Sequence, residues 1–288
     1  NTVRFLLGAL RDEPAPAVES VPLEALDRWA LVRLGQVLDG VEAAYRRYAF
    51  RAAFALMLDF TQELSAFYLD ASKDWLYNDA ATSPRRASAL AVMQRIARDL
   101  AVALAPLLPF SAEDIWDHLP ALAGKKESVH LATWPAAPRD AEADALVRAM
   151  EALRRLREGA FAALEPLVQA WGVEKQSAKK EGREAGAGER AFDPSVRIDH
   201  PRDAALTVAL SPHEHAALGP FAASAAELLG VGSLTFVPGD TLRVEAVRAP
   251  GPACARCWRR RPDVTPLGVC TRCEAAVRLL DEASPAGR

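Results

Sequence analysis

The chain has 288 residues, of which half are hydrophobic and a quarter are charged, and its formal net charge is -3. This length and composition suit two or three globular domains. The near-neutral charge excludes a protein that grips nucleic acid with its whole surface, so any nucleic-acid site must be local. The longest apolar run, residues 100–110, contains two prolines and is shorter than the roughly 20 residues that a membrane helix needs.

The first 138 residues carry the hydrophobic periodicity of a helical bundle. Over residues 23–51, apolar residues recur in steps of three and four, which places them on one face of a helix. A shorter helix is expected after Pro109, with Ser111 as its N-cap. Further helices are predicted over residues 54–68 and 90–104. We therefore expect an antiparallel helical bundle over residues 1–138.

The remaining chain changes character several times. Residues 139–171 are predicted to form a connecting helix, and residues 172–192 have the Glu, Lys, Gly and Ala composition of a flexible charged linker. Three strand-like stretches and one helical stretch predict a small α+β domain over residues 193–247, followed by a tail over residues 248–288. The strands are expected at residues 204–210, 234–237 and 242–247, and the helical stretch at residues 212–229.

Four cysteines in the tail carry the strongest chemical signal. Cys254 and Cys257 are separated by two residues, Cys270 and Cys273 likewise, and twelve residues lie between the pairs. Two such pairs supply the four thiolates that zinc prefers, at roughly 2.3 Å per bond. Protein would fill every position of the ion, so we expect one structural Zn²⁺ ion that drives folding of the tail. Two disulfides or four free thiols are the alternatives.

Basic and aromatic residues surround the cysteine pairs. Arg256, Trp258, Arg259 and Arg260 follow the first cysteine closely. Arginine can pair with phosphate or stack on a base, and tryptophan can stack on an unpaired base, as in the recognition of RNA loops. We predict that these residues bind RNA. The alternative is that Trp258 forms the small core of the tail and that the arginines are solvated surface.

A second run of aromatic and charged residues lies over residues 67–77. It can present Lys73 and stacking rings to RNA, although aromatic residues at helical spacing are more often part of a core. We expect most of these rings to be buried and keep Lys73 as an RNA-binding candidate.

No catalytic residue is predicted within this chain. The five histidines show no spacing with a carboxylate or cysteine that suggests a ligand set or a catalytic triad. The glycines at positions 182, 186 and 188 lie in the charged linker rather than between a strand and a helix, so they do not indicate a phosphate-binding loop.

Several stretches match a known pattern in order and spacing. They are NTVRFLLG at residues 1–8, DRW at 27–29, FYLD and KDWLY within 67–77, LAPLLPFSAEDIW at 104–116, and CARCW with CTRC in the tail. The stretches up to residue 77 resemble the segments that follow the catalytic core in isoleucyl-tRNA synthetases, which are class I aminoacyl-tRNA synthetases. The stretch at 104–116 is similar to the end of the helical anticodon-binding domain in the class I synthetases for isoleucine, valine and leucine alike. The tail resembles the C-terminal zinc finger of the bacterial isoleucyl enzymes, whereas valyl enzymes typically end in a coiled coil.

The resemblance implies a mainly α architecture, with an anticodon-binding helical bundle, a small α+β domain and a four-cysteine zinc finger. It implies that the whole enzyme attaches isoleucine to its tRNA using ATP, while this portion binds the tRNA and recognises its anticodon. The HIGH and KMSKS motifs and the editing domain do not occur in this chain. We therefore expect ATP and Mg²⁺ to bind only in a catalytic core upstream, and this chain to be inactive alone.

The expected partners are isoleucine tRNA and the upstream catalytic and editing domains of the same protein, in a cytoplasmic monomer without membrane contact. Residue 1 is asparagine and residues 1–8 already form an amphipathic stretch, so we expect the sequence to begin inside a longer protein. Two alternatives are a stand-alone zinc-finger module that binds nucleic acid without catalysis, and a purely structural zinc-stabilised interaction domain.

Overall fold

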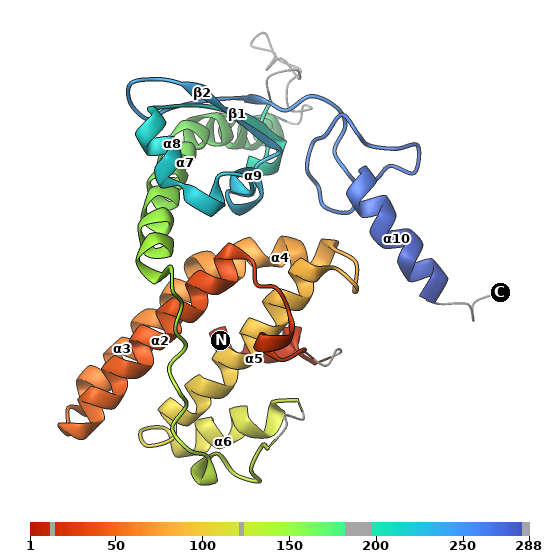
Figure 1. Ribbon diagram of the computed structural model, residues 1–288. Helices are drawn as coiled ribbons and strands as arrows, with labels where there is room; N and C mark the ends of the chain where they lie inside the picture. The colour runs from red at the N-terminus through yellow and green to blue at the C-terminus, as the bar shows by residue number, and fades with distance from the viewer. Residues whose placement is uncertain (12–14, 121–123, 182–196, 284–288) are drawn as a thin grey trace. The chain divides into compact units, whose positions relative to one another are not determined.

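The computed structural model describes residues 1–11, 15–120, 124–181 and 197–283 (Figure 1). The chain folds as two compact units, Asn1–Leu146 and Val147–Arg288. In the described part of the chain, each helix is too short or too polar to cross a lipid bilayer. The architecture is mainly α with one small sheet, which confirms the predicted fold class.

The first unit is a bundle of helices around an apolar core. Its longest helices, α2, α3 and α5, pack with their apolar faces inward, and Trp29, Phe60 and Met93 are among the largest buried side chains. The elements are α1 (Thr2–Ala9), η1 (Val18–Ser20), α2 (Ala25–Arg46), α3 (Phe50–Glu63), the π-helical turn η2 (Leu64–Tyr68), α4 (Leu69–Asn78), α5 (Pro84–Leu104), α6 (Pro109–His118) and η3 (Val129–Leu131).

Two helix ends differ from the sequence prediction. The first long helix does not continue to residue 51, because Tyr48 adopts a left-handed backbone conformation with φ 57° and separates α2 from α3. Helix α6 begins at Pro109 and not after Ser111, so Ser111 is not its N-cap. Proline at the first helical position has no amide hydrogen to leave unpaired and already has a helical φ.

A buried polar group ties α2 to two other elements of the bundle. The hydroxyl of Tyr68 donates to Asp27 Oδ1 at 2.6 Å, and the hydroxyl of Ser88 donates to Asp27 Oδ2 at 2.5 Å. All three side chains are fully buried. Burial raises the pKa of Asp27 to about 7, although the hydrogen bonds from Ser88 and Tyr68 act in the opposite direction.

The segment after η3 runs back along the bundle and is fixed to α2. Arg28 donates to both carboxylate oxygens of Asp140 at 2.8 and 2.7 Å. A side chain at Gly35 would collide with the backbone carbonyl of Pro138, so glycine permits this close approach. These contacts hold residues 132–140 as a strap on the bundle.

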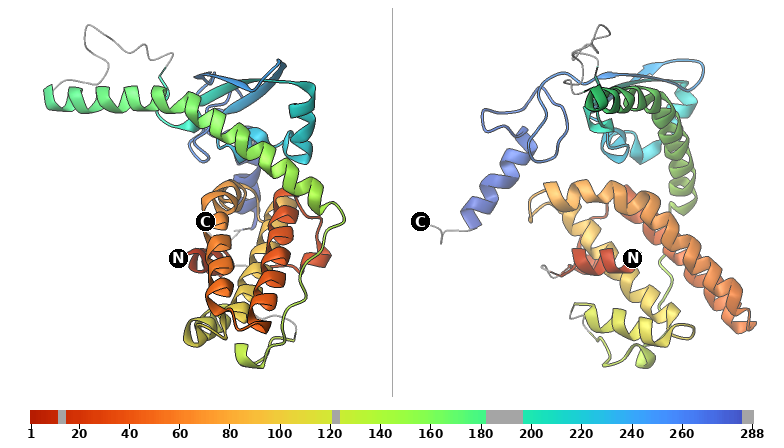
Figure 2. Two further views of the ribbon diagram at one scale, coloured as in Figure 1. Left: turned by 90° about the vertical axis from the view of Figure 1, so that its left-hand side faces the viewer. Right: turned by 180° about the vertical axis from the view of Figure 1, so that it is seen from behind.

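The second unit contains a long helix and a three-stranded sheet (Figure 2). Strand β1 is central, parallel to β2 and antiparallel to β3. A Cβ atom added at Gly159 of the long helix would lie 3.4 Å from the side chain of Leu242, just before β3. The long helix therefore passes close to this residue. The elements are α7 (Ala143–Glu181), η4 (Pro201–Asp203), β1 (Ala204–Leu210), α8 (Pro212–Ala217), η5 (Gly219–Phe221), α9 (Ala225–Leu228), β2 (Ser233–Pro238), β3 (Arg243–Arg248) and α10 (Thr271–Ala283).

The structure corrects the prediction of a flexible linker over residues 172–192. Helix α7 continues through Glu181, so residues 172–181 are helical and not a flexible linker. Lysine, glutamate and alanine are strong helix formers, so this composition fits a solvent-exposed helix as well as a flexible linker. Residues 182–192 of the predicted linker lie outside the described residues. The single helical stretch expected over residues 212–229 is divided into α8, η5 and α9.

Replacing Asp27 with asparagine should weaken the pH dependence of stability. Between pH 4 and 7 the folded chain keeps a proton on Asp27 that the unfolded chain releases, so the free energy of unfolding falls as pH rises. The loss is at most about 1.4 kcal/mol per pH unit. Urea unfolding followed by circular dichroism at pH 5 and pH 7 should show a smaller difference for Asp27→Asn than for the wild type. Equal differences would contradict the assignment.

Candidate metal centre and nucleic-acid interface

The four cysteines of the tail meet at one point. Their sulfur atoms all lie within 4.8 Å of one another, and the side chains are buried. The first pair lies in the turn after β3, where Ala253 and Arg260 form a β-bridge across it. The second pair lies at the start of α10, so the helix holds Cys273 one turn from Cys270.

The geometry and chemistry of this cluster fit a metal ion. A tetrahedral ion with bonds of roughly 2.3 Å places its sulfur ligands about 3.8 Å apart, and Cys257 Sγ lies 3.9 Å from Cys270 Sγ. That separation excludes a disulfide between these two, and all four cysteines are free. The four cysteines could therefore hold one metal ion with no position left for substrate.

The surroundings act differently on the thiols of the cluster. Burial raises the pKa of Cys257 to about 11 and also raises the pKa of Cys273. At Cys254 burial acts the same way, but backbone amides of Cys257, Cys270 and Arg256 outweigh it and lower the pKa to about 6. The amide of Cys270 donates to Cys254 Sγ at 3.2 Å. A bound cation favours the thiolate form at every position.

Trp258 is presented to solvent and does not form a core. Its side chain is 66% exposed and its backbone is left-handed, with φ 62°. The guanidinium of Arg202 lies 5.6 Å from the centre of the indole ring and donates to the carbonyl of Cys257 at 3.1 Å. The exposed ring of Trp258 therefore forms a cation–π contact with Arg202 of η4. The packing against the cysteines comes instead from Val264 and Val269.

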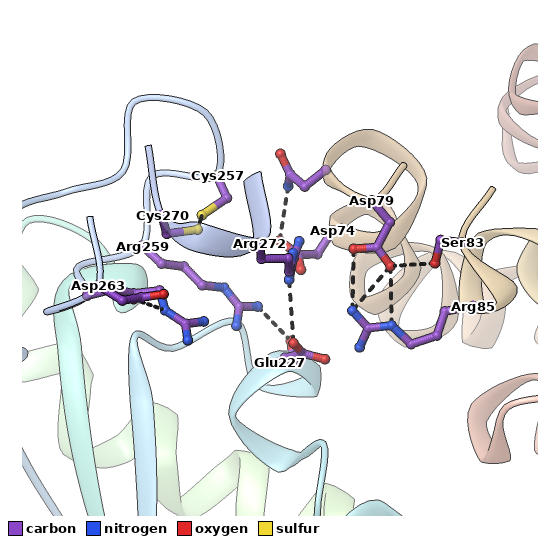
Figure 3. A network of polar contacts seen from close by, with 12 residues as sticks. Asp74, Asp79, Ser83, Arg85, Glu227, Cys257, Arg259, Asp263, Cys270 and Arg272 are labelled. Carbon is purple, nitrogen blue, oxygen red and sulfur yellow. Dashed lines mark hydrogen bonds and ion pairs between the residues drawn. The ribbon is translucent and has the colours of Figure 1, made fainter. Parts of the chain in front are cut away.

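One of the predicted RNA-binding arginines, Arg259, faces inward. Arg259 is 2% exposed, and its Nη2 donates to the backbone carbonyl of Glu227 at 3.4 Å. Arg272 Nη1 lies 3.4 Å from the carboxylate of the same glutamate, so both guanidinium groups point toward α9 (Figure 3). Arg260 Nε donates to Asp203 Oδ1 at 3.1 Å. Arg256 is half-buried.

These contacts fix the cysteine-rich tail to the α+β domain. The backbone amide of Arg260 donates to the carbonyl of Arg202 at 3.1 Å, and the amide of Ala249 donates to the carbonyl of Asp203 at 2.7 Å. We call residues 249–279 the cysteine module. Sequence reasoning missed Arg202, Asp203 and Glu227, because isolated charged residues in the α+β region carry no signal of what they contact in the folded chain.

Lys73 lies on α4 with half of its surface accessible. Its ammonium is 3.6 Å from Asp70 and 5.8 Å from the centre of the Phe5 ring. Most aromatic rings in this segment are buried, as predicted, namely those of Phe67, Tyr68 and Trp75. Tyr77 is 62% exposed.

Comparison with known proteins gives the class of the first unit. Residues 27–167 match the family described as the anticodon-binding domain of tRNA ligase. The helical bundle is thus an anticodon-binding domain, a class of domain that binds tRNA.

The particular relatives are isoleucine–tRNA ligases. The chain is 34% identical over 292 residues to the enzyme of Synechococcus sp. (strain CC9311), covering 95% of this chain and 28% of that protein. It is 32% identical to the Geobacter sulfurreducens enzyme and 30% identical to the Thermotoga maritima enzyme, each across 96% of this chain and 29% of the relative. The chain belongs with the isoleucine–tRNA ligases and spans less than a third of the length of these relatives.

Replacing Cys270 with serine should unfold the cysteine module and spare the first unit. Serine removes one thiolate, and a structural metal supplies most of the folding energy of so small a module. Bound metal should be lost, and hydrogen exchange of amides in residues 249–279 should approach that of an unfolded chain. Arg278→Gln, an exposed change on α10, is the matched control and should keep the metal. Full protection of the module in Cys270→Ser would contradict this role.

Glu227→Gln should loosen the module without removing the metal. The change removes the carboxylate that faces the guanidinium of Arg272 and leaves the backbone carbonyl that accepts from Arg259, at a cost of about 1–3 kcal/mol. Thermal unfolding of the second unit should begin at lower temperature while metal content stays constant. Glu42→Gln, which breaks an exposed pair with Arg46, should cost less than about 1 kcal/mol. Equal effects of the two changes would argue against a special contribution from Glu227.

Proposed function

We propose that this chain is the C-terminal, tRNA-binding part of an isoleucine–tRNA ligase that attaches isoleucine to its tRNA using ATP. The observation that carries the proposal is similarity to isoleucine–tRNA ligases along 95% of the chain. The match of the bundle to an anticodon-binding domain supports the same assignment. The partner tRNA is then isoleucine tRNA, and the catalytic residues lie in the other parts of the protein.

The metal of the cysteine module is proposed to be one Zn²⁺ ion held by Cys254, Cys257, Cys270 and Cys273. An all-sulfur set of four ligands is the donor set that zinc takes in structural sites. When bound, the ion would supply a fixed tetrahedral link between the turn after β3 and the start of α10. Its contribution is structural, since the four cysteines leave no open position.

We assign contact with RNA to the exposed side chains around the proposed metal site. Trp258 offers one open ring face, and Arg202 covers the ring and carries a positive charge. Unpaired bases stack on such faces, and guanidinium groups pair with phosphate. Arg256 and Lys73 are proposed as further tRNA contacts. Arg259 and Arg260 are proposed to act by holding Trp258 in place.

Binding far from the reacting atoms can still speed the reaction of the whole enzyme. Energy gained at the anticodon end can be used to position the acceptor end of the tRNA. Loss of these contacts should therefore impair transfer of isoleucine to tRNA more than formation of the adenylate.

The purified chain should bind isoleucine tRNA more tightly than a tRNA with an altered anticodon. Because phosphate contacts depend on ionic strength, both affinities should be measured at the same stated salt concentration. Trp258→Ala should weaken binding about 5- to 150-fold, the range expected for loss of one stacked base. A zinc chelator should have a similar or larger effect.

Arg278→Gln serves as the control, since it changes an exposed charge on α10 but not the exposed ring. Equal, weak binding of both tRNAs that is unaffected by Trp258→Ala or by the chelator would refute anticodon recognition through the module. The cysteine site would then be only a structural support.

A further inference from the structure

The turn between α2 and α3 has an unusual residue at its tightest point. The amide of Ala49 donates to the carbonyl of Ala44, and the amide of Tyr48 donates to the carbonyl of Tyr45, both at 2.9 Å. This is the Schellman arrangement, in which the left-handed position is usually glycine. A tyrosine with φ 57° occupies it here, at a cost of roughly 1–2 kcal/mol. Strained positions of this kind are often found at ligand contacts.

The strain holds an aromatic ring in solvent. Tyr48 is 81% exposed and Phe50 is 46% exposed, and the two ring centroids lie 6.1 Å apart. Beneath them, the ring of Tyr45 lies 6.1 Å from Phe50 and 6.0 Å from Trp134 of the strap. The hydroxyl of Tyr45 donates to the carbonyl of Ala103 at 2.7 Å, which fixes the Tyr45 ring to α5. We call Tyr48, Phe50, Tyr45 and Trp134 the aromatic tip; its turn lies at the end of the α2–α3 hairpin (Figure 1).

Positive charge accompanies the aromatic tip. Arg47 and Arg51 are exposed on either side of the turn, and neither guanidinium forms an ion pair or hydrogen bond with the residues that the structure describes. Arg46, by contrast, is paired with Glu42. Trp134 also lines a cavity of about 400 Å³ together with Lys125, Lys126 and the ion pair of Arg98 with Asp99. The surface therefore combines open ring faces with cations, as sites for unpaired nucleotides do.

We propose that the aromatic tip is an RNA-binding site, separate from the cysteine module, at which Tyr48 and Phe50 stack on unpaired bases and Arg47 and Arg51 contact phosphates. The proposal rests on the proposed function only in taking tRNA as the natural ligand. A protein partner fits less well, because the unpaired arginines would need matching carboxylates, whereas every nucleotide brings its own phosphate. RNA is therefore the occupant favoured by charge.

Tyr48→Gly separates binding from folding. Glycine adopts a left-handed conformation without strain, so the variant should melt at the same or a higher temperature while losing the ring. Its affinity for an isoleucine tRNA transcript should fall about 5- to 150-fold. Phe110→Ala removes another exposed ring, 88% accessible on α6, and should bind like the wild type.

Arg47→Gln and Arg51→Gln test the phosphate contacts. Each should reduce the slope of log K against log salt by about 0.7, the value for one phosphate of a single strand. Arg139→Gln, whose arginine is already paired with Asp39, should leave the slope unchanged. Unchanged affinity and slope in the tip variants would overturn the proposal and assign the tip to contact with protein.

A single-stranded oligouridylate as second probe distinguishes this proposal from the proposed function. If the wild-type chain binds oligouridylate in a Tyr48-dependent manner but does not bind the tRNA, the tip is an RNA site and the tRNA assignment fails. If the chain binds the tRNA and neither probe responds to Tyr48→Gly, only the tip proposal fails.

Discussion

The cysteine module depends on the convergence of four cysteine sulfurs. Among the residues that the structure describes, the partly buried apolar residues packed against that cluster are Val264 and Val269. This is too little apolar surface to order roughly thirty residues of chain against their conformational entropy. Burial opposes the thiolate form at Cys257 and Cys273, and a bound cation would favour the thiolates and link the turn after β3 to the start of α10. A metal bound at this cluster would hold closed the turn that presents the exposed ring of Trp258.

Arginine serves two opposite purposes in this chain, and burial separates them. Arg259 is almost fully buried beside Glu227, and Arg260 is bonded to Asp203, so both stabilise the attachment of the cysteine module. A buried cation without its partner strongly destabilises the fold, so these arginines are held to their particular acceptors. Arg47 and Arg51 remain in water, where a cation costs little and can exchange its hydration for a phosphate.

The sequence predicted what depends on local spacing and failed where long-range contacts decide. The strand at Ala204–Leu210 and the four metal-ligand candidates follow from periodicity and from paired cysteine spacing. The inward orientation of Arg259 depends on Glu227, 32 residues earlier in the chain, and no local pattern reports it. The spacing of apolar residues predicts one continuous helix through Tyr48, since a tyrosine gives no sign of the left-handed turn that a glycine would mark.

The small net charge also constrains how this chain can recognise RNA. Many of its cations are neutralised in place, as Arg28 is by Asp140, Arg33 by Glu63 and Arg95 by Asp99. A surface balanced in this way produces little long-range attraction for a polyanion. Recognition must then come from short-range contacts, namely stacking on exposed rings and pairing with the few cations left in water. Such contacts require bases that are already unpaired, and an anticodon loop provides them whereas a duplex does not. The charge balance itself therefore favours loop recognition over general binding to nucleic acid.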